Sequence, residues 1–285
     1  MTMHRDFDDS RPHENSPQER PQVNQRPALR PNEREPEIHD QRNVYHLRDK
    51  SYRLNPLEAT MLADVGKFRT IEKGDLLQHI YTGDQKSFDR DLTHLHRQNL
   101  VRIVGPKGSV TKYIVLTKPA KHLAEKHLKT NSRQEIYAGA VKIRELKHDA
   151  ALYRLYQKAA QDIEKRGGRP LRLVLDYELK SKINKRRART KDLARNQPQE
   201  RLRQIAEEQD LRVVNGKIPL PDLRIEYEDS NGDLSHCDLE YVTEDYRAAG
   251  MAEKRAAGFQ LYGNDPSGRG RKPYGPDLIG GLISL

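Results

Sequence analysis

The spacing of apolar residues predicts three short helices near the start of the ordered chain, over about residues 55–68, 72–81 and 85–98. In these segments apolar side chains recur every three or four residues, which is the period of a helix with one buried face. Asn55 and Glu58 are typical of an N-cap and its reciprocal acid, which together bond the free amides of a first helical turn. We therefore expect a small helical domain to begin here.

The third predicted helix has two distinct faces. Its apolar positions are Phe88, Leu92 and Leu95, and a separate basic face carries Lys86, Arg90, His94 and Arg97. The β-prone runs 100–104 and 113–116 follow it and form a hairpin with a basic tip that includes Lys107 and Lys112. Three helices and a hairpin in this order indicate a winged helix-turn-helix domain, whose third helix enters the major groove while the hairpin contacts phosphates. A dimerisation or protein-docking module with the same small fold is the alternative.

Strand periodicity dominates the second half of the chain. A long helical pattern covers about 133–165; its first part is expected to be a connector, and the part from about Glu145 the opening helix of a second domain. Residues 171–179 then alternate between apolar and polar and predict a strand that ends near Glu178. A helix is expected from Pro198, then a short strand over 211–214 and a tight turn. The segment 221–262 predicts two strands joined by a turn over 229–232, followed by a helix that contains Lys254.

A dense run of cations lies between residues 180 and 195, with Lys185, Arg186, Arg187 and Arg189 at its centre. It is interpreted as a segment that grips phosphates, and a solvated loop or helix face is the plainer alternative.

Composition narrows the class of partner. The net charge is +10 and the isoelectric point about 9.5, which favours a polyanion, with double-stranded DNA first. Charged residues make up 33% of the chain and hydrophobic ones 34%, so part of it cannot bury a core. We expect residues 1–48, which show no apolar period, to form a disordered arm. The single cysteine excludes an internal disulfide framework, and the lack of a long apolar run leads us to expect a cytoplasmic protein with no membrane partner.

Two carboxylates in the segment 221–262 are candidates for metal chemistry. Asp222 begins one predicted strand and Glu240 is central in the next, so the two lie side by side if the strands pair. Carboxylate oxygens suit Mg²⁺ or Mn²⁺, which polarise a phosphodiester and lower the pKa of an attacking water. The backbone carbonyl of Tyr241 is a candidate third ligand, and Lys254 could orient the water or stabilise developing negative charge.

Pro221-Asp222 followed by Glu240 on the next strand resembles the PD-(D/E)XK nuclease-like superfamily. Val242 stands where that pattern has its lysine, and the resemblance implies that Lys254 on the following helix replaces it, as in some members. Glu178 and Glu145 are further acids that related folds would add to the site.

The order of elements is also similar to the replication-relaxation family of plasmids and mobile elements, with the segments ELKHDAALYRLY, RLVLDYELK, PDLRIEYE, DLEYVTEDY and KRAAGFQLY after the winged helix. The resemblance covers about residues 55–262.

The expected fold is therefore α+β with two domains: the arm is followed by a winged helix-turn-helix domain over 49–130 and a nuclease-like α/β domain with a mixed sheet over 131–285. The expected function is DNA binding in replication, relaxation or transfer, with metal-dependent nicking or cleavage left open. The alternatives are a non-catalytic transcriptional or copy-number regulator with a degenerate dimerisation domain and, behind it, an RNA-processing or structural interaction protein. A homodimer is compatible with the DNA-binding function and with the regulator.

Overall fold

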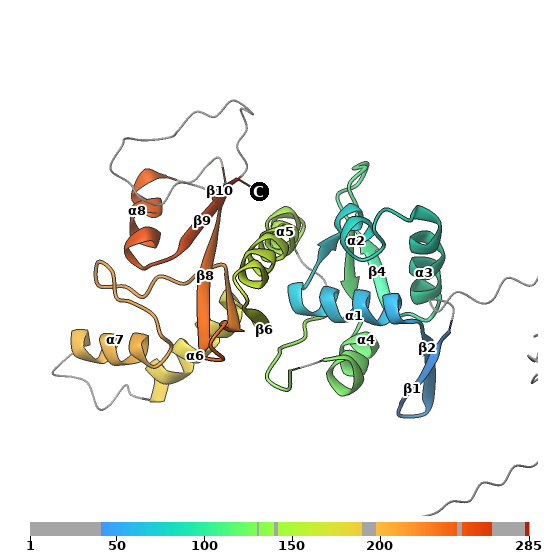
Figure 1. Ribbon diagram of the computed structural model, residues 1–285, viewed down its shortest axis with the longest axis horizontal. Coiled ribbons are helices and arrows are strands. Elements are labelled where there is room, and N and C mark those ends of the chain that lie inside the picture. Colours follow the sequence, from blue (N-terminus) through green and yellow to red (C-terminus); the bar gives the residue numbers. More distant parts are fainter. Residues whose placement is uncertain are drawn as a thin grey trace, which may run out of the picture. The chain divides into compact units, whose positions relative to one another are not determined.

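The computed structural model describes residues 41–129, 131–139, 142–189, 198–243, 247–263 and 283–284. The first 40 residues of the expected arm and the end of the basic run beyond Arg189 lie outside these ranges. The fold is mixed α+β (Figure 1). None of the helices in the described ranges is long and apolar enough to cross a membrane.

The N-terminal half contains a helical module with a small sheet. Its elements are β1 (Asn43–Leu47), β2 (Lys50–Leu54), α1 (Pro56–Phe68), β3 (Ile71–Glu72), α2 (Lys73–His79), α3 (Gln85–Arg97), β4 (Val101–Val104), β5 (Tyr113–Leu116), α4 (Lys118–Leu123) and a π-helical turn (Ala124–Leu128). Strands β4 and β5 form an antiparallel hairpin, and β3 extends it to a sheet of order β3-β5-β4. The three predicted helices and the hairpin are confirmed.

Local capping explains where α1 begins. The Asn55 side chain accepts a hydrogen bond from the Glu58 amide at 2.8 Å, and the Glu58 carboxylate accepts one from the Asn55 amide at 2.9 Å. This reciprocal arrangement is the predicted capping box. Both residues are fully buried, and the Asn55 amide group also donates a hydrogen bond to Asp91 of α3 at 2.8 Å.

The hairpin β1–β2 was not expected, since its first strand falls within the segment assigned to the arm. Tyr45 pairs with Tyr52 across the hairpin, and both side chains turn toward the protein while their neighbours are exposed. Among the described residues, regular structure therefore begins at Asn43, inside the segment that the sequence assigned to the arm.

The C-terminal half is built on a mixed sheet. Its elements are α5 (Ile143–Lys165), β6 (Arg169–Leu175), α6 (Asp176–Arg189), α7 (Pro198–Glu207), β7 (Leu223–Glu228), β8 (Leu234–Val242), α8 (Ala248–Ala256), β9 (Gln260–Gly263) and β10 (Ile283–Ser284). The sheet order is β10-β9-β8-β7-β6; β7 runs antiparallel to both neighbours, whereas β8, β9 and β10 are parallel.

Three expectations for this half need correction. The strand predicted over 171–179 ends at Leu175, and helix α6 begins at the next residue. Leu179 and Ile183 are buried four residues apart, which is the spacing of one helix face and not of a strand. The helical pattern that starts at about 133 forms a helix only from Ile143, close to residue 145, where the opening helix of the second domain was expected. Residues 211–214 form no strand, and a single bridge joins Val214 to Lys217 across the predicted turn.

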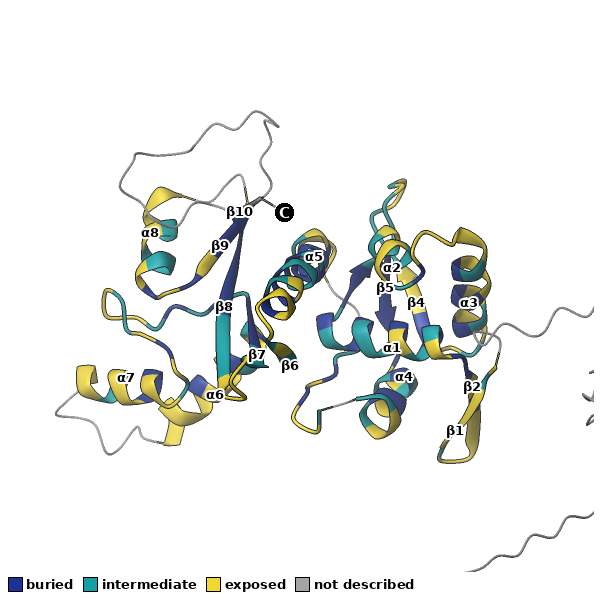
Figure 2. Cartoon of the chain, in the orientation of Figure 1, coloured by how far each residue is buried: buried dark blue, intermediate teal, exposed yellow. Residues whose placement is uncertain are grey.

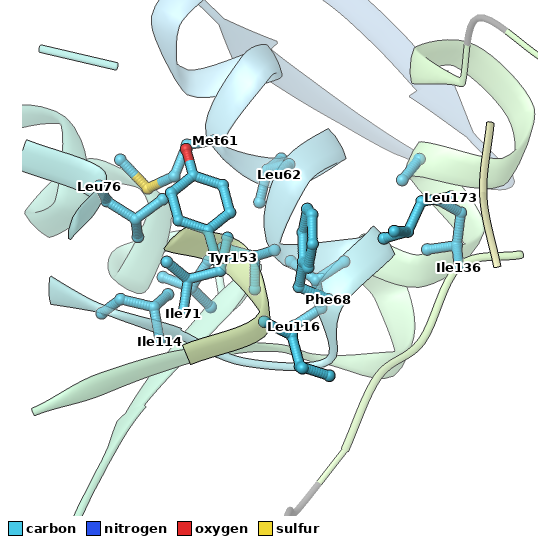
Figure 3. Close-up of a cluster of buried hydrophobic side chains, with 14 of the residues drawn as sticks. Met61, Leu62, Phe68, Ile71, Leu76, Ile114, Leu116, Ile136, Tyr153 and Leu173 are labelled. Carbon is cyan, nitrogen blue, oxygen red and sulfur yellow. The ribbon is translucent and has the colours of Figure 1, made fainter. Parts of the chain in front are cut away.

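One hydrophobic core joins α5 to both halves of the chain. Phe68 of α1 meets Tyr153 of α5 edge to face, with ring centroids 5.1 Å apart, and both side chains are buried (Figure 3). The same cluster continues through Leu173 of β6 to Leu223 and Leu239 of the β7–β8 pair. Helix α5 thus positions the sheet and its loops against the helical module.

Candidate functional site

The predicted acids lie at the end of the β7–β8 pair. Leu223 pairs with Leu239, so the next positions outward on the two strands are Asp222 and Glu240. The Asp222 carboxylate accepts a hydrogen bond from the backbone amide of Tyr241 at 2.9 Å. The turn predicted at 229–232 fixes this register, and a slip of one residue would turn Glu240 to the other face of the sheet.

Lys254 lies against Glu240. Its ammonium nitrogen is 2.7 Å from a carboxylate oxygen of Glu240 and donates a hydrogen bond to the carbonyl of Leu220 at 2.6 Å. The Glu240 side chain is only 3% exposed, so this lysine compensates a carboxylate that is held away from water. The structure therefore brings Lys254 of α8 to Glu240, the placement that the nuclease-like resemblance implied.

His148 and Asp149 of α5 extend the site on the Asp222 side; from the sequence, His148 was expected to be a packing or interhelical residue. His148 Nε2 is 3.4 Å from Asp222, and His148 Nδ1 is 3.6 Å from Asp149. Hydrogen bonding to Asp149 and then to Asp222 raises the pKa of His148 to about 10, so the imidazole is cationic at neutral pH. The His148 ring also packs edge to face on Tyr241 at 5.9 Å.

Arg69, at the end of α1, completes this cluster from the other half of the chain. It donates to Asp149 at 2.9 Å, and its guanidinium lies 4.2 Å from the ring centroid of Tyr177. Burial raises the pKa of the neighbouring Asp176, and the negative charges of Asp222 and Asp149 raise it further. No local sequence pattern links these residues, because 80 positions separate Arg69 from Asp149.

Glu178 does not join the other acids. It sits in the first turn of α6 rather than at the end of a strand, and it forms ion pairs with Arg172 and with Lys182, the latter at 2.8 Å. Glu145 forms a loose pair with Arg69 at 3.8 Å. In the described parts of the chain no three metal-binding side chains gather into a group that could hold an ion.

The basic residues of α3 differ in exposure and in the partners of their side chains. Lys86, Arg90 and Arg97 are exposed, opposite the buried positions Phe88, Leu92 and Leu95 (Figure 2). Arg90 lies 3.0 Å from Asp91. His94 is bound more tightly, since its Nδ1 lies 2.6 Å from the buried carboxylate of Glu58.

The β4–β5 hairpin stands beside the N-terminal end of α3. Lys107 is exposed at its tip and Lys112 is half-buried. A groove between the hairpin and the helices is lined by Lys73 of α2, Gln85 and Phe88 of α3, and Val110 and Lys112 of the hairpin.

The basic run after residue 180 is helical as far as the structure describes it. Lys185, Arg187 and Arg189 are exposed on α6, whereas Arg186 pairs with Glu208 at 2.6 Å. The helix therefore presents a cationic surface next to α7.

Comparison of this chain with protein-family models, with curated proteins and with solved structures gave no match.

Proposed function

We propose that this chain binds double-stranded DNA through α3 and the β4–β5 hairpin, and that it acts in the replication, relaxation or transfer of a plasmid or mobile element. The observation that carries the binding proposal is the composition of α3: one face packs into the core, while Lys86, Arg90 and Arg97 point to solvent on the other. The order of three helices and a hairpin is that of a winged helix-turn-helix domain.

The cationic surfaces support the same partner. The hairpin beside α3 adds Lys107 and Lys112, and α6 adds Lys185, Arg187 and Arg189. Cations that neutralise phosphates release condensed counterions, which drives binding and makes it depend on salt. His94 does not contact DNA in this proposal. Its bond to Glu58 holds α3 against α1, so the histidine positions the helix.

The test is the salt dependence of binding by the full chain to a 30-base-pair duplex of mixed sequence, measured by fluorescence anisotropy. Removing two phosphate contacts in a Lys86→Gln/Arg97→Gln variant lowers the slope of log K against log salt by about 1.8. A Lys165→Gln/Arg166→Gln variant, which loses the same charge at the end of α5, serves as the control. Equal slopes for the two variants, or no binding by the parent chain, would refute the proposal.

A second candidate function, metal-dependent cleavage of the bound DNA, is favoured by the contact between Lys254 and Glu240. Apart from α6 and α7, which lie between β6 and β7, the elements from α5 to β9 run helix, three strands, helix and strand, and the strands form the mixed sheet that the resemblance to nuclease-like domains implies. Two carboxylates fit a Mg²⁺ or Mn²⁺ ion, because such ions retain several water ligands and need few protein groups.

In that function Asp222 and Glu240 would hold the ion, which would polarise the phosphate and lower the pKa of a bound water. Lys254 would place its positive charge beside the phosphate. The Tyr241 amide orients Asp222 through their hydrogen bond.

Nicking of supercoiled plasmid in Mg²⁺ or Mn²⁺, lost in Asp222→Asn and Glu240→Gln while duplex binding persists, would establish cleavage. Binding without nicking by the parent chain would instead identify the non-catalytic regulator, in which the sheet module serves dimerisation.

A further inference from the structure

The hairpin β1–β2 stands at the C-terminal end of α3. The Gln98 side chain, which follows the last turn of α3, accepts a hydrogen bond from the Arg53 amide and donates one to the Arg53 carbonyl, both at 3.3 Å. This pair of bonds fixes the base of the hairpin to the end of the helix. Figure 1 shows the hairpin projecting away from this end of α3, with its turn at the far end.

One face of the hairpin is anchored and the other is open. Tyr45 and Tyr52 face the protein, and the Tyr45 ring packs edge to face on His127 at 5.7 Å. On the other face Val44 pairs with Arg53, and the neighbouring pair is His46 with Ser51; all four residues are exposed (Figure 2). The open face therefore has no covering element among the described residues.

The charge on this hairpin is nearly all positive. Arg48, Lys50 and Arg53 are exposed and, within the described parts of the chain, form no ion pair, while Asp49 is the only acid between Asn43 and Leu54. Lys126 and His127 add to the cluster, because both approach the carbonyl of His46, at 3.4 and 3.0 Å. An anionic partner is the complement of such a surface.

The two hairpins bracket α3. Gln85 and Phe88, in the first turn of α3, share a groove with Val110 and Lys112 of the β4–β5 hairpin, whereas Gln98 at the other end holds β2. A helix that lies in the major groove would thus have a basic hairpin at either end.

We propose that β1–β2 is a second wing, which grips the DNA backbone beyond the C-terminal end of α3 through Arg48, Lys50 and Arg53. The inference rests on the proposed function, because it takes α3 as the helix that enters the groove. Five residues per strand give the hairpin a reach of about 16 Å. That is roughly half of a 34 Å helical turn, or about five base pairs.

The experiment uses the full chain with the substitutions Arg48→Asn, Lys50→Gln and Arg53→Gln. Asparagine suits position 48, where φ is 52° and lies in the left-handed region. The control removes the same charge elsewhere, through Lys165→Gln, Arg166→Gln and Arg169→Gln. A charge-preserving Lys50→Arg variant shows whether the hairpin tolerates substitution, and thermal denaturation reports the folding of each variant.

If β1–β2 contacts phosphates, the triple variant lowers the slope of log K against log salt by about 2.7 and weakens binding to the 30-base-pair duplex at least about tenfold at 100 mM salt. Hydroxyl-radical protection by the parent chain extends about five base pairs further on one side than protection by the variant. The control and Lys50→Arg bind as the parent does.

The outcomes separate this inference from the proposed function. If Lys86→Gln/Arg97→Gln weakens binding and the hairpin triple variant does not, the second wing is refuted while the proposed function stands. If neither affects binding, the proposed function itself fails. A triple variant that changes the sedimentation coefficient and leaves the salt slope intact would identify the hairpin as a contact between copies of this chain, which also overturns the inference.

Discussion

The buried pair Arg224–Asp238 should be the largest single electrostatic contribution to the stability of the β7–β8 hairpin. The two residues are directly paired across the strands, and their side chains are 6% and 9% exposed. Two bonds of 2.6 and 2.8 Å join the guanidinium to the carboxylate, and the same guanidinium also donates to the carbonyls of Gln209 and Asp210.

The perturbation is Asp238→Asn, which keeps the shape of the side chain and removes its charge. Breaking a buried pair from one side costs about 3–5 kcal/mol, because the remaining charge stays buried without its partner. The carbonyls of Gln209 and Asp210 continue to hold Arg224, so we expect the lower end, about 3 kcal/mol. With an m-value of roughly 2 kcal/mol per molar urea, the unfolding midpoint falls by about 1.5 M.

The assay is urea denaturation followed by circular dichroism. The matched control is Glu228→Gln in the neighbouring pair Arg169–Glu228, which lies at 2.9 Å on the exposed end of the sheet. An exposed pair contributes at most about 1 kcal/mol. If Asp238→Asn lowered the midpoint no more than Glu228→Gln, burial would not govern the strength of this pair, and the reasoning would be refuted.

Three further predictions follow from local features of the fold. Asn55→Ala should lower the free energy of unfolding by about 2 kcal/mol, because it removes a buried helix cap together with the buried hydrogen bond from the Asn55 amide group to Asp91. Thermal denaturation measures this loss, and a loss no larger than that of Asp84→Ala, at the exposed cap of α3, would contradict the reasoning. Gly216→Ala should cost about 1 kcal/mol in the same assay, because φ is 71° there while space is open around the added methyl. Burial raises the pKa of the Cys237 thiol to about 11, so iodoacetamide should alkylate it at pH 8 about 100-fold more slowly than a free cysteine, and faster once urea unfolds the chain. The stability that this thiol contributes is complete below about pH 8.5 and is lost as the pH rises toward 11. Rapid labelling of the native chain at pH 8 would rule out a raised pKa.

Elements with a strong local signal were predicted well from the sequence. The capping box of Asn55 and Glu58 fixed the start of α1, and the turn over 229–232 fixed the register that places Asp222 beside the strand of Glu240. The contact of Lys254 with Glu240 came from the family resemblance, since nothing in the spacing of the two residues requires it.

The remaining features depend on long-range packing, for which the sequence has no local signal. Strand β1 is short, and only two of its residues, Tyr45 and Leu47, face inward. Their alternation can be recognised as that of a strand only once the partner strand β2 is known. Helix α6 starts where the alternation of apolar and polar residues in β6 changes to apolar residues four positions apart. The apolar residues at the end of β6 hide this boundary in the sequence. The cluster of Arg69, Asp149 and His148 joins elements that are distant in the chain.

The shared core around α5 has a consequence for how this chain folds and for how it can be dissected. Ile136 and Tyr153 fill space beside Phe68 and Ile71, so a fragment that stops at residue 130 would expose a large apolar surface. Such a fragment should aggregate or remain partly unfolded, and limited proteolysis should not release the helical module intact. Unfolding should be a single cooperative transition for both halves, which ties the presentation of α3 to the integrity of the sheet.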